Sequence, residues 1–401
     1  MFDFKKNYDY YKSQLFDSIL PFWEKHSIDN EFGGILNCLD REGKVYSTDK
    51  SVWLQGRCAY TFSKLCNTYG KNDNWLKIAK SCLDFLNDHC IDSDGRMFFL
   101  VTRDGKPLRK RRYYFSETFY IIANAEYYKA TGDKSALENA KKFFDMVYSI
   151  YVNPKTDPYK ITPKFCDGVR PLKSLASPMI LLNVATIMAK VDVENKARYV
   201  KIVKKLVKDL ELFNKKGTNL MLETVGEKGE YLSNVSSCRI INPGHSIELS
   251  WFLIEAGELL NDKSLLEKAE RIFNSAFVIG WDKAYGGILY FFDCECKPIE
   301  AYEHDMKLWW PHAETLIASM KLYQKTGNEK YLRIFQKVTN YVKKHFADDE
   351  FGEWYGYLRR DGKPTMPPCK GHTYKGPFHT LRATLMVEQM LKEELHNKGL
   401  I

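Results

Sequence analysis

The sequence predicts an all-α protein, an (α/α)6 barrel in which six outer and six inner helices close into a six-hairpin toroid, with short β-hairpins at one mouth. The first observation is a recurring helix start, in which Asp or Asn follows a short turn. Five such starts stand at positions 73, 133, 192, 262 and 328, so successive starts are 60, 59, 70 and 66 residues apart. Five junctions divide the chain into six units, as in a repeat architecture.

The second observation is a strand-like run that ends in an Asp-containing turn followed by lysine. It occurs at 32–44, 98–106, 285–297 and 354–363, and the closing lysines are 62, 191 and 66 residues apart. The middle interval corresponds to about three units. Runs of this kind are typical of β-hairpins, so we expect an element of helix, hairpin and helix to repeat around the chain.

The third observation is that the two helices of each unit differ in character. The first is lysine-rich and amphipathic, as in KIVKKLVK (201–208), which favours an outer layer facing solvent. The second is apolar nearly all round, as in SPMILLNVA (177–185), which favours an inner layer. The expected pairs are 4–27 with 52–69, 74–89 with 115–131, 134–152 with 172–190, 193–213 with 244–260, 263–279 with 309–326, and 328–347 with 376–395.

These pairs predict one domain, residues 1–401, with an axial cavity; an open solenoid is the alternative architecture. The chain is 44% hydrophobic, and no stretch approaches the roughly 18 uninterrupted apolar residues of a membrane span. Residues 1–16 are polar and lack the pattern of a secretory signal. The ten cysteines include no CxxC, which favours a reducing compartment. We therefore expect a cytoplasmic protein with no membrane partner.

The net charge of +9 does not predict a nucleic-acid partner. The positive charges are spread over many lysines, and the densest run, RKRR at 109–112, is only four residues long. A nucleic-acid surface would need a wider basic face with interleaved aromatic residues. We interpret the run as part of a solvated hairpin.

The most informative stretch is Asn-Pro-Gly-His-Ser-Ile-Glu-Leu-Ser-Trp at 242–251. Asn242 is a suitable helix N-cap and Pro243 a suitable first helical residue. At 3.6 residues per turn, His245, Glu248 and Trp251 then share one helix face. A lone histidine here could merely cap its helix, but two further segments, 310–314 and 376–379, also place a histidine shortly after a helix-opening proline.

Because all inner helices should run in the same direction, their first turns should meet at one mouth of the barrel. Aromatic planes among a few polar groups are suited to a sugar-sized ligand. The candidate site residues that these first turns supply are Trp53, Arg57, Tyr114, Glu117, His245, Glu248, Trp251, Trp310, His312, Glu314, His379 and Arg382.

Proton transfer is the chemistry that this set favours, since two imidazoles can serve as base and conjugate acid near their ordinary pKa of about 6.5. A metal site of His245, Glu248 and His379 is an alternative, although no HExxH motif supports it. Glycoside hydrolysis by a pair drawn from Glu117, Glu248, Glu303 and Glu314 is a second one. A non-catalytic carbohydrate- or protein-binding barrel is a third, but it would leave the two histidines at one mouth unexplained.

Five segments carry a resemblance that covers essentially the whole chain. They resemble the N-acylglucosamine 2-epimerase family, whose members are (α/α)6 barrels, and they lie at 50–65, 111–133, 242–260, 307–318 and 370–385. The resemblance implies that His245 and His379 are the two catalytic bases. It also implies that Arg57 lies at the substrate oxygens, that Glu248 supports His245, and that Trp310 and Glu314 hold the sugar.

The resemblance implies epimerisation at C2 of N-acetyl-D-glucosamine and N-acetyl-D-mannosamine, within carbohydrate and sialic acid metabolism. Members that act on cellobiose or unacylated sugars carry a histidine on the third inner helix, where this chain has Ser-Pro-Met-Ile at 177–180, and tend to have Gln where it has His312. Both differences favour the N-acyl branch; a cellobiose or mannose 2-epimerase or an aldose–ketose isomerase is the alternative. The resemblance further implies a homodimer that requires no metal or redox cofactor, with ATP as a possible activator that is not consumed.

Overall fold

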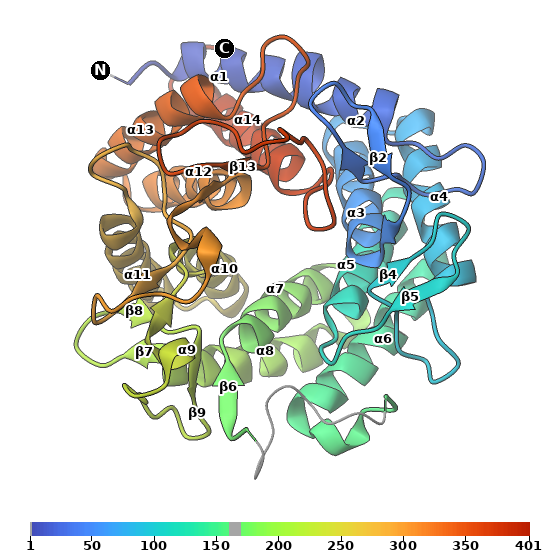
Figure 1. The fold of residues 1–401 in the computed structure, drawn as a ribbon, viewed down its shortest axis with the longest axis horizontal. Helices are drawn as coiled ribbons and strands as arrows, with labels where there is room; N and C mark the ends of the chain where they lie inside the picture. Colours follow the sequence, from blue (N-terminus) through green and yellow to red (C-terminus); the bar gives the residue numbers. More distant parts are fainter. Residues whose placement is uncertain (1, 160–169) are drawn as a thin grey trace.

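The computed structural model describes residues 2–159 and 170–401, which form two concentric rings of helices (Figure 1). The inner ring consists of α3 (Val52–Tyr69), α5 (Phe115–Thr131), α7 (Ala176–Val191), α10 (Pro243–Leu260), α12 (Trp309–Thr326) and α14 (His379–Asn397). Neighbouring inner helices pack in this order, and α14 closes the ring against α3. The predicted (α/α)6 barrel is confirmed.

The outer ring begins with three helical segments that follow one another without a gap. These are α1 (Phe4–Ser13), the π-helical η1 (Gln14–Ile19) and α2 (Leu20–His26). The other outer helices are α4 (Asp73–His89), α6 (Lys134–Val152), α8 (Lys196–Leu210), α11 (Ser264–Gly280) and α13 (Lys330–His345). A short helix, α9 (Ser236–Arg239), belongs to neither ring. Because α1 packs on α14, the first unit covers the last inner helix and the two chain ends lie near each other (Figure 1).

Local signals set the helix ends close to where the sequence predicts them. The Asn72 side chain accepts hydrogen bonds from the backbone N–H groups of Asn74 and Trp75 and so caps α4. Gly132 and Gly327 end α5 and α12 in the left-handed conformation, at φ of 76° and 68°. The third inner helix, however, starts at Ala176 and not at 172, because residues 172–174 pair as a strand.

No single helix in the described part of the chain is long and apolar enough to cross a membrane. Helix α7 and residues 193–213 have the length and composition of a membrane span only when they are taken together, and the chain bends by 114° between them.

The strands lie on the face where the inner helices begin. They are β1 (Cys38–Leu39) with β2 (Val45–Ser47); β3 (Lys50–Ser51) with β4 (Leu100–Val101) and β5 (Pro107–Arg109); β6 (Leu172–Ser174) with β9 (Thr224–Gly226); β7 (Asn214–Lys215) with β8 (Leu220–Met221); β10 (Ile240–Ile241) with β11 (Phe292–Asp293); and β12 (Lys307–Leu308) with β13 (Tyr357–Leu358). The hairpins predicted near 32–44 and 98–106 are confirmed. The hairpin predicted at 354–363 also forms, with Leu358 bridged to Pro364, and β13 pairs in addition with β12. The hairpin predicted at 285–297 is wrong, because β11 pairs with β10, which directly precedes an inner helix.

A repeated ion pair fixes these strands to the outer ring. In three units a buried aspartate that follows the outer helix binds the lysine that precedes the inner helix, and an arginine from a neighbouring hairpin also reaches the same carboxylate. The sets are Asp29 with Lys50 and Arg103, Asp282 with Lys307 and Arg360, and Asp348 with Lys370 and Arg41. Each aspartate thus joins its own unit to the next one.

Candidate active site

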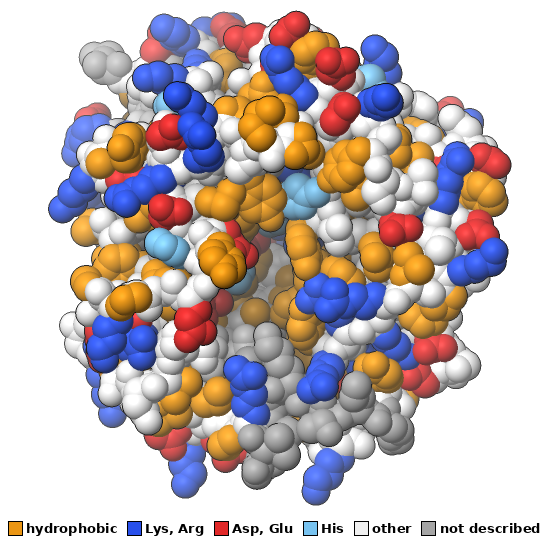
Figure 2. Space-filling view, viewed as in Figure 1, with side chains coloured by type: hydrophobic (Ala, Val, Ile, Leu, Met, Phe, Trp, Pro, Cys, Tyr) orange, Lys and Arg blue, Asp and Glu red, His pale blue; other side chains and the backbone are white. Residues whose placement is uncertain are grey.

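A cavity of about 1500 Å³ opens on the face where the inner helices begin. Its lining comes from the first turns of all six inner helices, with a few residues further along them, from the loops that precede these helices, and from parts of the outer helices α6 and α8. Figure 2 shows the opening at the middle of this face, with hydrophobic side chains and histidines at its edge. Since the N-terminal ends of six helices meet here, the cavity favours a ligand that carries or develops negative charge.

His245 lies in the first turn of α10, and a carboxylate that the sequence did not single out holds its ring. Asn242 caps the helix by accepting the backbone N–H of His245 at 3.1 Å. The imidazole Nδ1 lies 3.0 Å from both carboxylate oxygens of Glu223. Nδ1 therefore donates to Glu223, which leaves Nε2 without the proton and available to a ligand. The predicted support of His245 by Glu248 is thus replaced by Glu223.

His379, the first residue of α14, is held in the same way by a different carboxylate. Its Nδ1 lies 2.7 Å from Glu314 Oε1, and the side chain of Glu314 is fully buried. Here too the carboxylate fixes the proton on Nδ1 and leaves Nε2 available. The cavity therefore contains two imidazoles of the same tautomer, each oriented by its own glutamate.

Arg382 of α14 bridges the glutamates of two other inner helices, Glu314 of α12 and Glu248 of α10, next to the histidines. One guanidinium nitrogen, Nη2, donates to Glu314 at 2.6 Å and to Glu248 at 3.0 Å. The second oxygen of Glu314 accepts the indole N–H of Trp251 at 2.8 Å. Glu314 is therefore saturated by protein partners and positions His379. Glu248 and Arg382 line the cavity, whereas Glu314 and Trp251 lie behind its wall.

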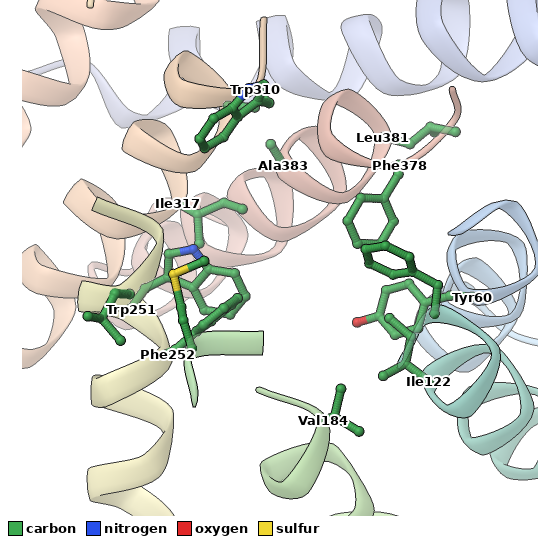
Figure 3. Close-up of a cluster of buried hydrophobic side chains, with 14 of the residues drawn as sticks. Tyr60, Ile122, Val184, Trp251, Phe252, Trp310, Ile317, Phe378, Leu381 and Ala383 are labelled. Atoms are coloured by element: carbon green, nitrogen blue, oxygen red, sulfur yellow. The ribbon is translucent and has the colours of Figure 1, made fainter. Parts of the chain in front are cut away.

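Trp310 lies between the two histidines. Its ring centroid is 5.1 Å from that of His245 and 5.9 Å from that of His379. The indole thereby forms the side of the cavity between α10 and α14. Figure 3 shows Trp310 on one side of the space within the inner ring and Phe378 on the other.

Arg57 lines the cavity from α3. Its guanidinium carbon lies 4.1 Å from the ring centroid of Phe119 and 4.9 Å from that of Phe378. Nη1 donates to the backbone carbonyl of Tyr374 at 3.4 Å, while Nε is buried without a partner among the described residues. Burial lowers the pKa of Arg57 to about 9. A cation in these surroundings gains from an anionic ligand that satisfies its free N–H groups.

The two histidines differ in basicity. Burial alone would lower the pKa of His245, but the Glu223 carboxylate outweighs burial, and the net pKa lies above its usual value. At His379 burial outweighs Glu314 and lowers the pKa to about 3; Arg57 and Arg382 act in the same direction as burial. Of the two imidazoles, His245 is therefore the one that more readily takes up a second proton, on Nε2.

Comparison with known proteins gives matches that cover most of the chain. The sequence profile described as N-acylglucosamine 2-epimerase (GlcNAc 2-epimerase) matches residues 33–383. The chain belongs to the N-acylglucosamine 2-epimerase family. It is 35% identical to the N-acylglucosamine 2-epimerase of Bos taurus, over 94% of this chain and 90% of that one, and 34% identical to that of Homo sapiens, over 94% and 88%.

Solved structures agree with the fold of this N-acylglucosamine 2-epimerase family member. A cellobiose 2-epimerase from Bacillus thermoamylovorans superimposes with a TM-score of 0.83 at 22% identity, covering 96% of this chain and 99% of that one. A D-mannose isomerase gives the same TM-score at 18% identity, covering 95% and 97%.

Four of the expected sugar-binding residues do not line the cavity in this family member: Glu314 and Trp251, which lie behind its wall, and Glu117 and His312. Glu117 is fully buried and accepts from Arg96 at 2.6 Å and from the backbone N–H of Met97 at 2.8 Å. His312 accepts the backbone N–H of Ile288 at 3.0 Å through Nε2. Both side chains hold the turn that follows an outer helix, and neither lines the cavity. Trp53 and Tyr114, by contrast, do line it.

The cavity of this family member is poorly suited to the two alternative chemistries. Ligand atoms of Glu248, Glu314 and His379 all lie within 4.8 Å of one another, as a metal site would require. The Arg382 guanidinium already donates to both carboxylates and would repel a cation. Glycoside hydrolysis would need a pair of available carboxylates, but protein donors occupy Glu314, and Glu117 lies outside the cavity. This leaves Glu248, which accepts from Arg382, and Glu303 at the exposed rim.

Proposed function

We propose that this protein catalyses the reversible C2 epimerisation of N-acetyl-D-glucosamine and N-acetyl-D-mannosamine. The pair of carboxylate-oriented imidazoles, His245 with Glu223 and His379 with Glu314, carries the proposal. Inversion at one carbon by proton transfer needs a base on one face and an acid on the other. The relatives named N-acylglucosamine 2-epimerase support the choice of substrate.

The reaction starts from the open-chain sugar, because the C2 hydrogen is acidic only next to a free C1 aldehyde. Nε2 of one histidine removes this proton, and the electron pair moves into the C1–C2 bond to give an enediolate-like anion. Nε2–H of the other histidine then delivers a proton to the opposite face of C2. When His245 carries a second proton, on Nε2, it is the acid and His379 is the base for one direction. The roles are reversed for the other direction.

Positive charge near the reacting carbons stabilises the intermediate. Arg57 has an unpartnered buried Nε, and Arg382 extends from the helix turn that follows His379. Donors fixed in advance around a developing oxyanion are typically the largest single contribution to catalysis. This scheme has no step that requires a metal or a redox cofactor. ATP as a non-consumed activator, the homodimer, the cytoplasmic location and a place in sialic acid metabolism stay predictions.

Turnover in D₂O tests the proposal. With N-acetyl-D-mannosamine as substrate, each product molecule should carry deuterium at C2, because the donating histidine exchanges its proton with solvent. Early in the reaction, recovered substrate should be labelled more slowly than product forms, since the abstracted proton resides on the other histidine. EDTA should leave the rate unchanged. Product that retains protium at C2 would exclude the two-base scheme.

Variants at the two histidines complete this test. His245→Asn and His379→Asn should each lower turnover by about 10²- to 10⁴-fold, the usual contribution of a positioned acid or base. His396→Asn, at the exposed end of α14, is the matched control and should keep full activity. Near-normal turnover by either active-site variant would contradict the assignment.

Cellobiose 2-epimerisation is the second candidate function. Curated cellobiose 2-epimerases are about 25% identical over most of the chain, for example the Bacteroides fragilis enzyme over 92% of this chain and 96% of that one. The cavity is also larger than one monosaccharide requires. Parallel incubation with N-acetyl-D-mannosamine, cellobiose and mannose distinguishes the candidates, and turnover of cellobiose alone would replace the first proposal by the second.

A further inference from the structure

Helix α7 presents a buried amide to the cavity. Asn183 lines the cavity, is only 6% exposed and has no side-chain hydrogen bond to any residue in the described part of the chain. Asn124 on the neighbouring α5 is equally buried, but it lies away from the cavity and donates to the Tyr120 carbonyl at 2.9 Å. Buried side-chain amides normally have partners. The amide of Asn183 is therefore open to the cavity and free to bind a ligand group there.

Apolar side chains surround this amide. Met179 lies one helical turn before Asn183, so the two residues share a face of α7, and both line the cavity. Ile122 of α5 and Phe252 of α10 line it from the two helices that flank α7. Figure 3 shows Ile122 and Phe252 on opposite sides of the inner space. This wall thus combines one amide with a small apolar surface.

The positions of the histidines determine which substituent of C2 faces this wall. His245 on α10 and His379 on α14 must take the two faces of the planar intermediate, and Trp310 on α12 fills the space between them. The C1 oxygen belongs near Arg57 and Arg382, where the positive charge lies. The side of C2 away from Trp310 then faces α5 and α7.

We infer that Asn183, Met179 and Ile122 form the subsite for the N-acyl group, an inference that rests on the proposed function. The Asn183 NH₂ group donates to the acetamido carbonyl, and Met179 and Ile122 contact the methyl group. A sugar with a hydroxyl at C2 offers no acyl carbonyl to this donor and no methyl group to Met179 and Ile122. Asn183 is accordingly a specificity-determining residue.

Kinetics of three variants test the subsite. Asn183→Ala and Asn183→Asp should raise KM for N-acetyl-D-mannosamine by about 3- to 10-fold, the value of a lost hydrogen bond, with a smaller change in kcat. Met179→Ala should raise kcat/KM for N-butanoyl- relative to N-acetyl-D-mannosamine by about tenfold, because it enlarges the space for the acyl chain. Asn124→Ala is the matched control and should change neither KM nor the acyl-chain ratio.

The outcomes separate this inference from the proposed function. If the wild-type protein turns over N-acyl sugars but Asn183→Asp keeps its KM and Met179→Ala keeps the acyl-chain ratio, only the subsite is wrong. If the wild-type protein turns over neither N-acyl sugar, the proposed function fails and the subsite fails with it. Because the acyl-chain ratio is measured within one variant, a general loss of stability cannot mimic the expected shift.

Discussion

At the residue scale, the site depends on the partner that each imidazole finds. His245 and His379 have the same tautomer, since each donates Nδ1–H to a glutamate. Their surroundings nevertheless shift the pKa in opposite directions, because the charge of Glu223 outweighs burial at His245, whereas burial, with Arg57 and Arg382 in the same direction, outweighs Glu314 at His379. Groups whose pKa values are moved apart in one pocket are typical of acid–base pairs.

Glu223→Gln should therefore change the pH dependence. The pair is active with one proton, so kcat/KM should fall as pH rises through the raised pKa of His245. Without the Glu223 charge, burial dominates and this pKa drops, which moves the alkaline limb of the kcat/KM profile to lower pH. Glu303→Gln, which removes a charge at the exposed rim of the same cavity, should leave the limb in place. An unshifted limb in Glu223→Gln would contradict the role of Glu223.

At the element scale, the site depends on how closely neighbouring inner helices approach. Gly244 in the first turn of α10 has no side chain where α12 passes. A Cβ atom built there would lie 2.7 Å from the Trp310 ring and 2.9 Å from Pro311. Such distances are shorter than van der Waals contact, so glycine is required for Trp310 to reach its place between the histidines.

Gly244→Ala should consequently lower activity although alanine is the better helix former by about 1 kcal/mol. The added methyl group must displace Trp310 or α12, and a shift of about 1 Å at a catalytic site can cost about 100-fold in rate. We expect at least a tenfold loss in kcat/KM with the helical circular dichroism signal retained. Wild-type kinetics in this variant would show that Trp310 does not set the distance between the histidines.

At the scale of the whole molecule, ion pairs between units hold the ring. Burial alone would raise the pKa of Asp282, but Lys307 and Arg360 outweigh it and lower this pKa to about 2. Arg41 and Lys370 likewise outweigh burial and hold the pKa of Asp348 well below its usual range. A lowered folded-state pKa contributes stability that is present above the unfolded pKa of about 4 and is lost as pH falls towards the folded value.

Asp348→Asn should lower the free energy of unfolding at pH 7 by about 3–5 kcal/mol, because it leaves the buried Lys370 without its counter-charge. The difference from wild type should shrink as pH falls below the unfolded pKa of about 4, because the unfolded wild-type chain then binds a proton on Asp348 that the folded protein does not. Urea titrations at pH 7, 4 and 3 measure both effects. The exposed neighbour Asp349→Asn is the control and should match wild type; a difference for Asp348→Asn that does not depend on pH would contradict the electrostatic origin.

The sequence by itself determined the architecture and much of the site. Helix caps and apolar periodicity are local signals, so the spacing of Asp73, Asp133 and their counterparts predicted six units, and the first turn of α10 predicted His245. The first turns also supplied Arg57, Trp310, His379 and Arg382, because helices that run in parallel bring equivalent positions together.

Only the tertiary structure decided which polar groups meet. Glu223 precedes a two-strand pairing and lies 22 residues before His245; the backbone bonds of Glu223 to Leu175 and Ile240 bring it to the start of α10. Glu117 and His312 occupy first turns as predicted, yet they turn away from the cavity to bind backbone N–H groups. Periodicity places a side chain on a helix face, but its hydrogen-bond partner depends on contacts between segments distant in sequence, which no local pattern contains.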